Sequence, residues 1–192
     1  MNICVYGASS KTIDKGYIEA GEELGRLIGS RGHALVFGGG ASGLMGAVAR
    51  GVREEKGRIF GVSPRFFDVD GILYDKCDNL FFTETMRERK QKMEDLSDAF
   101  VMTPGGVGTI EEFFEILTLK QLGRHTKPIV ILNTRQYFDR LFSFIDDAIY
   151  ERFMTPDNKR LYAVCDTPRQ VIRYIENYKA NHSGPVSKYK DI

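Results

Sequence analysis

Residues 99–117 read AFVMTPGGVGTIEEFFEIL, and this stretch decides the fold class. The apolar residues 99–102 predict a short buried strand. The run 103–108 predicts a tight turn, and the helical spacing of apolar residues from Thr109 to Leu122 predicts a helix directly after it. A strand that passes through glycines into a helix is the repeating unit of a parallel α/β sheet.

The same alternation of short strands and longer helices continues on both sides of this stretch. Strands are predicted at 3–6, 34–37, 58–62, 80–82, 99–102, 128–132 and 161–164. Helices are predicted at 14–30, 43–55, 83–96, 109–122, 135–150 and 168–179. We therefore expect an α/β fold with a doubly wound parallel sheet of about seven strands and helices on both faces. In such sheets ligands bind beyond the carboxyl ends of the strands.

Length and composition indicate one globular domain. The chain has 192 residues, of which 42% are hydrophobic and 28% charged, which is enough to build one core without disulfides or metals. We expect a single domain over residues 1–180 and a flexible polar tail over 181–192. Residues 65–78 show no clear hydrophobic periodicity and predict a long loop. In a compact domain, a loop of this length more often has a function than not.

Charge and cysteine usage limit the partners and the compartment. With a formal net charge of +1, the chain has no large excess of basic residues of the kind that binds nucleic acid or an anionic membrane. Neither is therefore expected as a partner, and a small molecule is the favoured ligand. Cys4, Cys77 and Cys165 are odd in number and widely spaced, which favours reduced thiols over a disulfide framework or a zinc site. The three histidines are scattered, so no metal is expected. Without a signal peptide or a window of about 18 apolar residues, we expect a cytoplasmic protein.

Two glycine runs, 38–40 and 105–108, stand between a predicted strand and the start of a helix. Glycines there allow a tight turn, and the free amides and dipole of the following helix suit a phosphate. Either run alone is explained by a simple turn, but two in one α/β domain favour a phosphorylated ligand. Neither run matches G-x-G-x-x-G or the Walker pattern, so the ligand is expected to be neither a standard NAD nor ATP. Ser9 and Thr109 are placed to add contacts.

Arg89 falls on the inward stripe of the predicted helix 83–96, together with Met86 and Met93, and Lys90 lies at its edge. A buried arginine costs desolvation free energy unless an anion meets it. One interpretation is that its long stem carries the charge to the surface. The other is that the guanidinium binds a phosphate or carboxylate of a substrate.

Glu112 also has two interpretations. The apolar face of the helix after the second glycine run carries Phe113 and Leu117, so Glu112 is expected to point away from the core. Thr109-x-x-Glu112 fits a capping box, and this pattern taken alone favours that structural role. The alternative is that a carboxylate faces the ligand, because acidic side chains beside a phosphate site would otherwise only repel the phosphate.

Three blocks of sequence together resemble the Lonely Guy family, the cytokinin riboside 5′-monophosphate phosphoribohydrolases formerly labelled lysine decarboxylases. The blocks are Gly38–Gly46, Met86–Lys90 and Pro104–Glu112. The last block matches the family signature P-G-G-x-G-T-x-x-E at every fixed position. The order and spacing of the blocks also agree, and the resemblance extends to about residue 178.

The resemblance implies a Rossmann-like fold, a homodimer or larger assembly of dimers, and a site near the subunit interface. It implies hydrolysis of the N-glycosidic bond of a purine nucleoside 5′-monophosphate to free base and ribose 5-phosphate, without a cofactor. It implies catalytic roles for Arg89 and Glu112. The substrate-binding residues expected from the resemblance and from the strand ends are Ser9, Gly40, Met86, Lys90, Gly105, Gly106, Val107, Gly108, Thr109, Glu111 and Thr118.

Two departures and three alternatives accompany this prediction. Arg87 stands where the family commonly has histidine and Val107 where it has an aromatic residue, and both changes bear on base preference.

The alternatives are a non-enzymatic nucleotide sensor or carrier, a pyridoxal-phosphate decarboxylase and an NAD(P) oxidoreductase. The second needs a Schiff-base lysine, for which no motif is present, and the third lacks the dinucleotide fingerprint. A cytokinin nucleotide, AMP and other purine monophosphates stay open as substrates.

Overall fold

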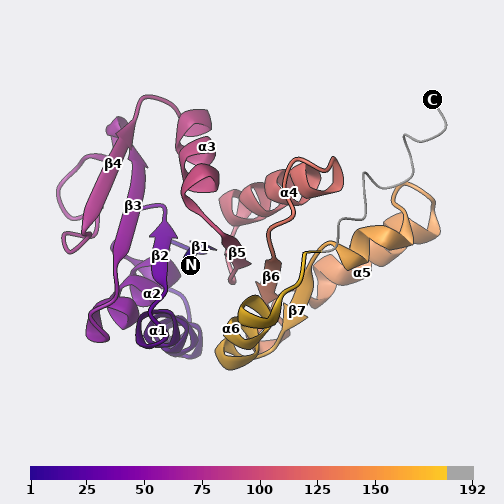
Figure 1. Ribbon diagram of the computed structural model, residues 1–192, viewed down its shortest axis with the longest axis horizontal. Helices are drawn as coiled ribbons and strands as arrows, with labels where there is room; N and C mark the ends of the chain where they lie inside the picture. The colour runs from indigo at the N-terminus through magenta and orange to yellow at the C-terminus, as the bar shows by residue number, and fades with distance from the viewer. Residues whose placement is uncertain (181–192) are drawn as a thin grey trace.

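Seven short apolar segments form one parallel sheet in a computed structural model that describes residues 1–180 (Figure 1). The strand order is β4-β3-β2-β1-β5-β6-β7. The strands are β1 (Asn2–Tyr6), β2 (Ala34–Phe37), β3 (Ile59–Pro64), β4 (Asn79–Thr83), β5 (Ala99–Met102), β6 (Ile129–Leu132) and β7 (Ala163–Cys165). The predicted tail 181–192 lies outside the described residues.

Helices cover both faces of the sheet. They are α1 (Lys15–Ser30), α2 (Gly43–Glu54), α3 (Met86–Leu96), α4 (Val107–Gln121), α5 (Asp139–Tyr150) and α6 (Pro168–Asn177). One core cluster packs α1, α2 and α6 against one face, and a second packs α3, α4 and α5 against the other. Figure 1 shows α1 and α2 together on one side and α3 beside α4 on the other. The predicted doubly wound fold is confirmed.

Two helices begin three and four residues later than predicted, for local reasons. The helix predicted from residue 83 begins at Met86, because Thr83 completes β4 and the hydroxyl of Thr85 caps the helix. The helix predicted from residue 135 begins at Asp139, because a short 3-10 turn with Arg135 at φ 57° precedes it. The strand and helix types themselves agree with the prediction.

The strand order reverses direction between β1 and β5. The chain first builds β2, β3 and β4 on one side of β1 and then returns to add β5, β6 and β7 on the other. Such a reversal separates the loops that leave the two central strands and opens a crevice for ligands. Tyr6 pairs with Met102 at the ends of these strands. The turns after β1 and β5 therefore line the crevice.

The loop between β3 and β4 is long, as predicted, and it folds back over β2. It contains the 3-10 turn Arg65–Phe67, and Leu73 forms an isolated bridge with Gly40. The amide of Ala41 donates to the carbonyl oxygen of Ile72 at 2.9 Å. The first glycine run is thus held by this loop.

None of the helices in the described part of the chain is both long and apolar enough to cross a bilayer.

Helices α1 and α2 approach backbone to backbone through glycines. A Cβ on Gly25 would lie 2.1 Å from the carbonyl oxygen of Val48, and one on Gly51 would lie 2.2 Å from that of Glu22. Because these obstacles are backbone atoms, they cannot rotate away. The close approach depends on the missing side chains.

Replacing Gly25 with Ala is expected to destabilise the fold by about 1–3 kcal/mol through overpacking. The measurement is the midpoint of urea unfolding. Gly108→Ala is the control, because a Cβ at Gly108 meets nothing within 4 Å. A Gly25→Ala variant as stable as the wild type would contradict the close packing.

Candidate active site

The start of α4 is open. Gly106 is its N-cap and, among the described residues, no side chain caps the helix. Gly106, Val107 and Gly108 are exposed. The first-turn N–H groups of a helix have no partner within the helix, so this end presents free donors and the positive end of the dipole. The structure thus leaves the predicted phosphate-binding turn accessible.

The predicted capping box at Thr109 and Glu112 is wrong. The helix begins at Val107, two residues earlier than predicted, so Thr109 lies inside its first turn rather than at its cap. Thr109 is buried and folds over the turn, where a Cβ on Gly105 would lie only 2.2 Å from its Oγ1. Gly105 is therefore a position that excludes a side chain.

Two segments, residues 6–8 at the end of β1 and Tyr137 after β6, hold the turn before α4. The amide and the hydroxyl of Thr103 both donate to the carbonyl oxygen of Tyr6, at 2.9 Å and 2.8 Å. The amide of Ala8 donates to the carbonyl oxygen of Pro104 at 3.2 Å. The hydroxyl of Tyr137 donates to the carbonyl oxygen of Gly105 at 2.9 Å. Tyr137 was not predicted as a site residue, because it follows a different strand and carries no motif.

Arg89 points inward from α3, and its side chain is only 9% exposed. Its Nε donates to the carbonyl oxygen of Val62 at 3.2 Å and its Nη1 donates to Oε1 of Glu112 at 2.8 Å. A Cβ on Gly38 would lie 2.0 Å from Nη2. The interpretation in which Arg89 carries its charge to the surface is wrong, since the guanidinium is enclosed between β3, Gly38 and α4.

Glu112 faces α3 rather than solvent, and its side chain is only 11% exposed. The expectation that it points away from the core is wrong, because the carboxylate accepts a hydrogen bond from the buried guanidinium of Arg89 on α3. Burial raises the pKa of the Glu112 carboxyl above its usual value, and the nearby Arg89 guanidinium opposes this shift. A buried carboxylate with a raised pKa next to an arginine is characteristic of functional sites.

Lys90 adds a second connection between the same helices. Its Nζ pairs with Glu111 and lies 2.9 Å from Oε2 of Glu115. Lys90 is mostly buried, whereas Glu111 and Glu115 are half exposed. The Arg89–Glu112 and Lys90–Glu111 contacts bring four predicted site residues together at one helix–helix junction.

Other predicted site residues lie around the carboxyl edge of the sheet. Ser9 is exposed in the turn after β1, and Met86 is exposed as the first residue of α3. Gly40 follows β2 and is bridged to Leu73. Val107 is exposed at the start of α4.

The first glycine run does not lead to an open helix end. The amides of Leu44 and Met45, in the first turn of α2, donate to the carbonyl oxygen of Ala8 at 2.8 Å and 3.2 Å. The protein's own backbone therefore occupies these donors. The prediction that both runs bind phosphate is corrected by this contact, and the second run is the accessible one.

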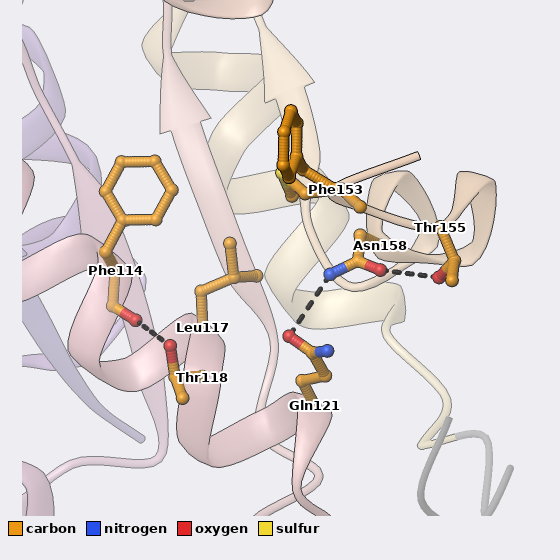
Figure 2. Close-up of a pocket in the computed structure, with 8 residues that line it drawn as sticks. Phe114, Leu117, Thr118, Gln121, Phe153, Thr155 and Asn158 are labelled. Carbon is orange, nitrogen blue, oxygen red and sulfur yellow. Dashed lines mark hydrogen bonds between the residues drawn. The ribbon is translucent and has the colours of Figure 1, made fainter. Parts of the chain in front are cut away.

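Thr118 lies apart from the Arg89–Glu112 pair. It follows Glu112 on α4 by about 9 Å along the helix axis, and its hydroxyl donates to the carbonyl oxygen of Phe114 at 2.7 Å. It lines a small pocket between α4 and the segment after α5. Figure 2 shows this pocket with Phe114, Leu117 and Gln121 opposite Phe153 and Asn158. Within one protomer, Thr118 is not part of the same cluster.

Comparison with known proteins places the chain among named relatives. The family model described as "Possible lysine decarboxylase" matches residues 45–175. The chain is 37% identical over 188 residues to a probable cytokinin riboside 5′-monophosphate phosphoribohydrolase of Oryza sativa subsp. japonica, covering 98% of this chain and 77% of the relative. It is 36% identical over 186 residues to a cytokinin riboside 5′-monophosphate phosphoribohydrolase of Arabidopsis thaliana, covering 97% and 87%.

A solved structure shares the fold. The molybdenum cofactor binding protein of Rippkaea orientalis superposes with a TM-score of 0.71 over 91% of this chain and 94% of that chain, at 20% identity. Identity this low supports the Rossmann-like architecture alone.

Replacing Arg89 with Gln is expected to raise the pKa of Glu112 further. The substitution removes the positive charge that opposes the effect of burial, so the carboxyl keeps its proton to a higher pH. The measurement is a ¹³C NMR titration of the Glu112 carboxyl. Arg87→Gln removes the same charge from an exposed position of α3 and should leave the titration near that of the wild type. An unchanged or lower pKa in Arg89→Gln would show that Arg89 does not stabilise the carboxylate.

Proposed function

We propose that this chain, which belongs to the family of the cytokinin riboside 5′-monophosphate phosphoribohydrolases, hydrolyses the N-glycosidic bond of a purine nucleoside 5′-monophosphate. The products are the free base and ribose 5-phosphate. The observation that carries the proposal is the buried ion pair, at 2.8 Å, between Arg89 on α3 and Glu112 on α4, the helix whose start is open. An anion site and a carboxylate on one helix are what this reaction requires.

The 5′-phosphate is assigned to the turn before α4. A phosphate monoester dianion accepts hydrogen bonds from the amides at a helix start and is stabilised by the helix dipole. Gly106 and Gly108 leave room for a close approach, since a Cβ at either position would meet nothing within 4 Å. Thr109 in the first turn of α4, and Lys90, which pairs with Glu111 and Glu115 farther along that helix, complete the substrate contacts in the proposal. Anchoring the phosphate holds the ribose next to α4.

Glu112 is assigned to the bond cleavage. The electron pair of the C1′–N9 bond leaves with the base, and positive charge develops on C1′ and the ring oxygen of the ribose. A carboxylate beside the sugar stabilises this charge and takes a proton from the attacking water, whose oxygen bonds to C1′. The leaving nitrogen of the base takes a proton from solvent and Glu112 returns its proton to solvent, so each turnover consumes one water. A raised pKa brings Glu112 closer to the working pH, which favours proton transfer.

Arg89 is assigned to orienting Glu112 and the substrate. Its hydrogen bonds to Val62 and Glu112 fix the guanidinium plane. Nη2 remains next to Gly38, where no side chain intrudes. A fixed guanidinium next to the carboxylate keeps Glu112 ionised despite its burial.

The decarboxylase alternative requires a lysine at the phosphate site. Burial lowers the pKa of Lys120 to about 8, which is the property a Schiff-base lysine needs. Lys120, however, lies about 18 Å along the helix axis from Gly108, with its Nζ over the Tyr178 ring. Lys90, the lysine predicted at the site, is engaged by two glutamates. Neither lysine fits that chemistry.

We also propose that two copies associate through α5 and the segment after it. Phe144, Tyr150 and Phe153 are 64%, 84% and 78% exposed. Large aromatic side chains are enriched at protein interfaces. The pocket with Phe114 and Thr118 adjoins this face, so an isologous pair would cover it.

The three cysteines are unpaired, which supports a reducing, cytoplasmic setting.

The direct test is incubation of the purified protein with AMP and with N6-isopentenyl-AMP. We expect free base and ribose 5-phosphate in equal amounts, detected by chromatography, from at least one of the two. Recovery of both nucleotides intact, with nucleotide tightly bound, would favour a carrier instead.

Replacing Glu112 with Gln is expected to preserve nucleotide binding and to lower kcat by about 10²-fold or more, because the variant cannot accept a proton. The measurement is steady-state release of base. Glu94→Gln is the control, since Glu94 is a partly buried glutamate on α3 whose carboxylate contacts neither Arg89 nor α4 in the described residues. Near-normal turnover by Glu112→Gln would remove Glu112 from the catalytic role.

Replacing Phe153 with Asp is expected to convert the dimer to a monomer, because a charge would be buried in the aromatic contact. The measurement is sedimentation equilibrium. Phe66→Asp introduces the same charge at an exposed phenylalanine of the β3–β4 loop and should leave the dimer intact. A wild-type protein that sediments as a monomer, or a dimeric Phe153→Asp variant, would rule out this interface.

A further inference from the structure

The peptide group between Gly105 and Gly106 joins the two glycines of the phosphate-binding turn. Neither glycine has a Cβ that restricts its backbone. A Cβ at Gly106 would meet nothing within 4 Å, so packing does not hold this peptide group on that side. Its orientation nevertheless decides whether the Gly106 N–H faces a bound anion. Some other contact has to fix it.

Tyr137 supplies that contact. Its hydroxyl donates to the carbonyl oxygen of Gly105 at 2.9 Å, a good hydrogen-bond distance. The described peptide bonds are trans, so the carbonyl and the following N–H point in opposite directions. Holding the Gly105 carbonyl toward Tyr137 therefore aims the Gly106 N–H away from it, toward the exposed side of the turn.

Tyr137 is itself held from two directions. The residues before it, Arg135 and Gln136, have φ values of 57° and 59°, a left-handed conformation that non-glycine residues keep only where their surroundings enforce it. The ring of Tyr17 packs edge-on against Tyr137 at 5.9 Å. The guanidinium of Arg135 lies 5.4 Å from the Tyr17 ring centroid.

This support reaches back to the start of α1. Nη1 of Arg135 donates to Oδ1 of Asp14 at 2.6 Å. The same oxygen accepts the amide of Gly16 at 2.8 Å and so caps α1. A continuous series of contacts thus runs from the cap of α1, through Arg135 and Tyr17, to the hydroxyl of Tyr137.

We infer that Tyr137 is a positioning residue that locks the Gly105–Gly106 peptide group in the orientation that binds the 5′-phosphate. The inference rests on the proposed function for the identity of the ligand group. Tyr137 acts through the backbone of the turn, so its loss weakens phosphate binding and leaves the groups at C1′ in place. KM therefore rises while kcat is retained.

The test is Tyr137→Phe, which removes the hydroxyl and keeps the ring packed on Tyr17. We expect the Kd for ribose 5-phosphate, measured by titration calorimetry, to rise about fivefold to tenfold, the effect of one lost hydrogen bond. KM for the nucleotide should rise by a similar factor, with kcat within about twofold. Tyr174→Phe removes a hydroxyl from α6, on the other face of the sheet, and should change neither quantity.

The outcomes separate this inference from the proposed function. Equal Kd values for Tyr137→Phe and the wild type, or a fall in kcat at unchanged Kd, would overturn the positioning role. A wild-type protein that binds ribose 5-phosphate but releases no base would refute the proposed reaction, while the ratio of Kd values would still decide the role of Tyr137. A wild-type protein that binds no ribose 5-phosphate would overturn both.

Discussion

The ion pair between Arg89 and Glu112 is the constraint around which the site is arranged. Removing two charges from water costs several kcal/mol per ion, and the attraction between them repays this only with good geometry and further hydrogen bonds. Here the carbonyl of Val62 accepts the remaining Nε–H at 3.2 Å, and the absence of a Cβ at Gly38 leaves space for Nη2. Replacing a buried ion pair with well-packed hydrophobic residues is often neutral or stabilising. The free energy of folding is therefore not a sufficient reason for two charges at these positions, and the proposed function supplies a chemical one.

The protonation of Glu112 reflects a balance of opposing effects. Burial raises the pKa of its carboxyl, and the charges of Arg89 and Lys90 lower it. The start of α4 also favours negative charge close by. A phosphate dianion at the same helix end adds negative charge near Glu112 and Glu111. Arg89 supplies the positive charge nearest to Glu112, and Lys90 supplies the one nearest to Glu111. In the proposed function, these two cations offset the negative charge of an anionic substrate beside the two carboxylates.

The sequence predicted the backbone better than the directions of side chains. The strands and helices follow from local hydrophobic period and from glycine turns, which do not depend on distant parts of the chain. The predicted direction of Glu112 was wrong because a helical projection considers only apolar packing on the sheet, whereas the Glu112 carboxylate accepts a hydrogen bond from Arg89 on α3. The capping box failed because Gly106, not Thr109, starts the helix. The first glycine run was assigned to phosphate because no local pattern reveals that the carbonyl of Ala8 occupies the start of α2.

The separation in sequence between residues that contact one another explains which site residues could be predicted. Arg89 and Glu112 belong to one continuous unit, α3–β5–α4, in which a four-residue buried strand leaves the two helices side by side on one face. Their pairing needs only that local unit and its handedness. The turn between them is held by Tyr6 and Ala8 from the end of β1 and by Tyr137 after β6. These three meet the turn only because the strand order places β1 and β6 on either side of β5. The local sequence thus determines which residues are assigned to the chemistry, whereas the order of the strands in the whole sheet determines how they are positioned.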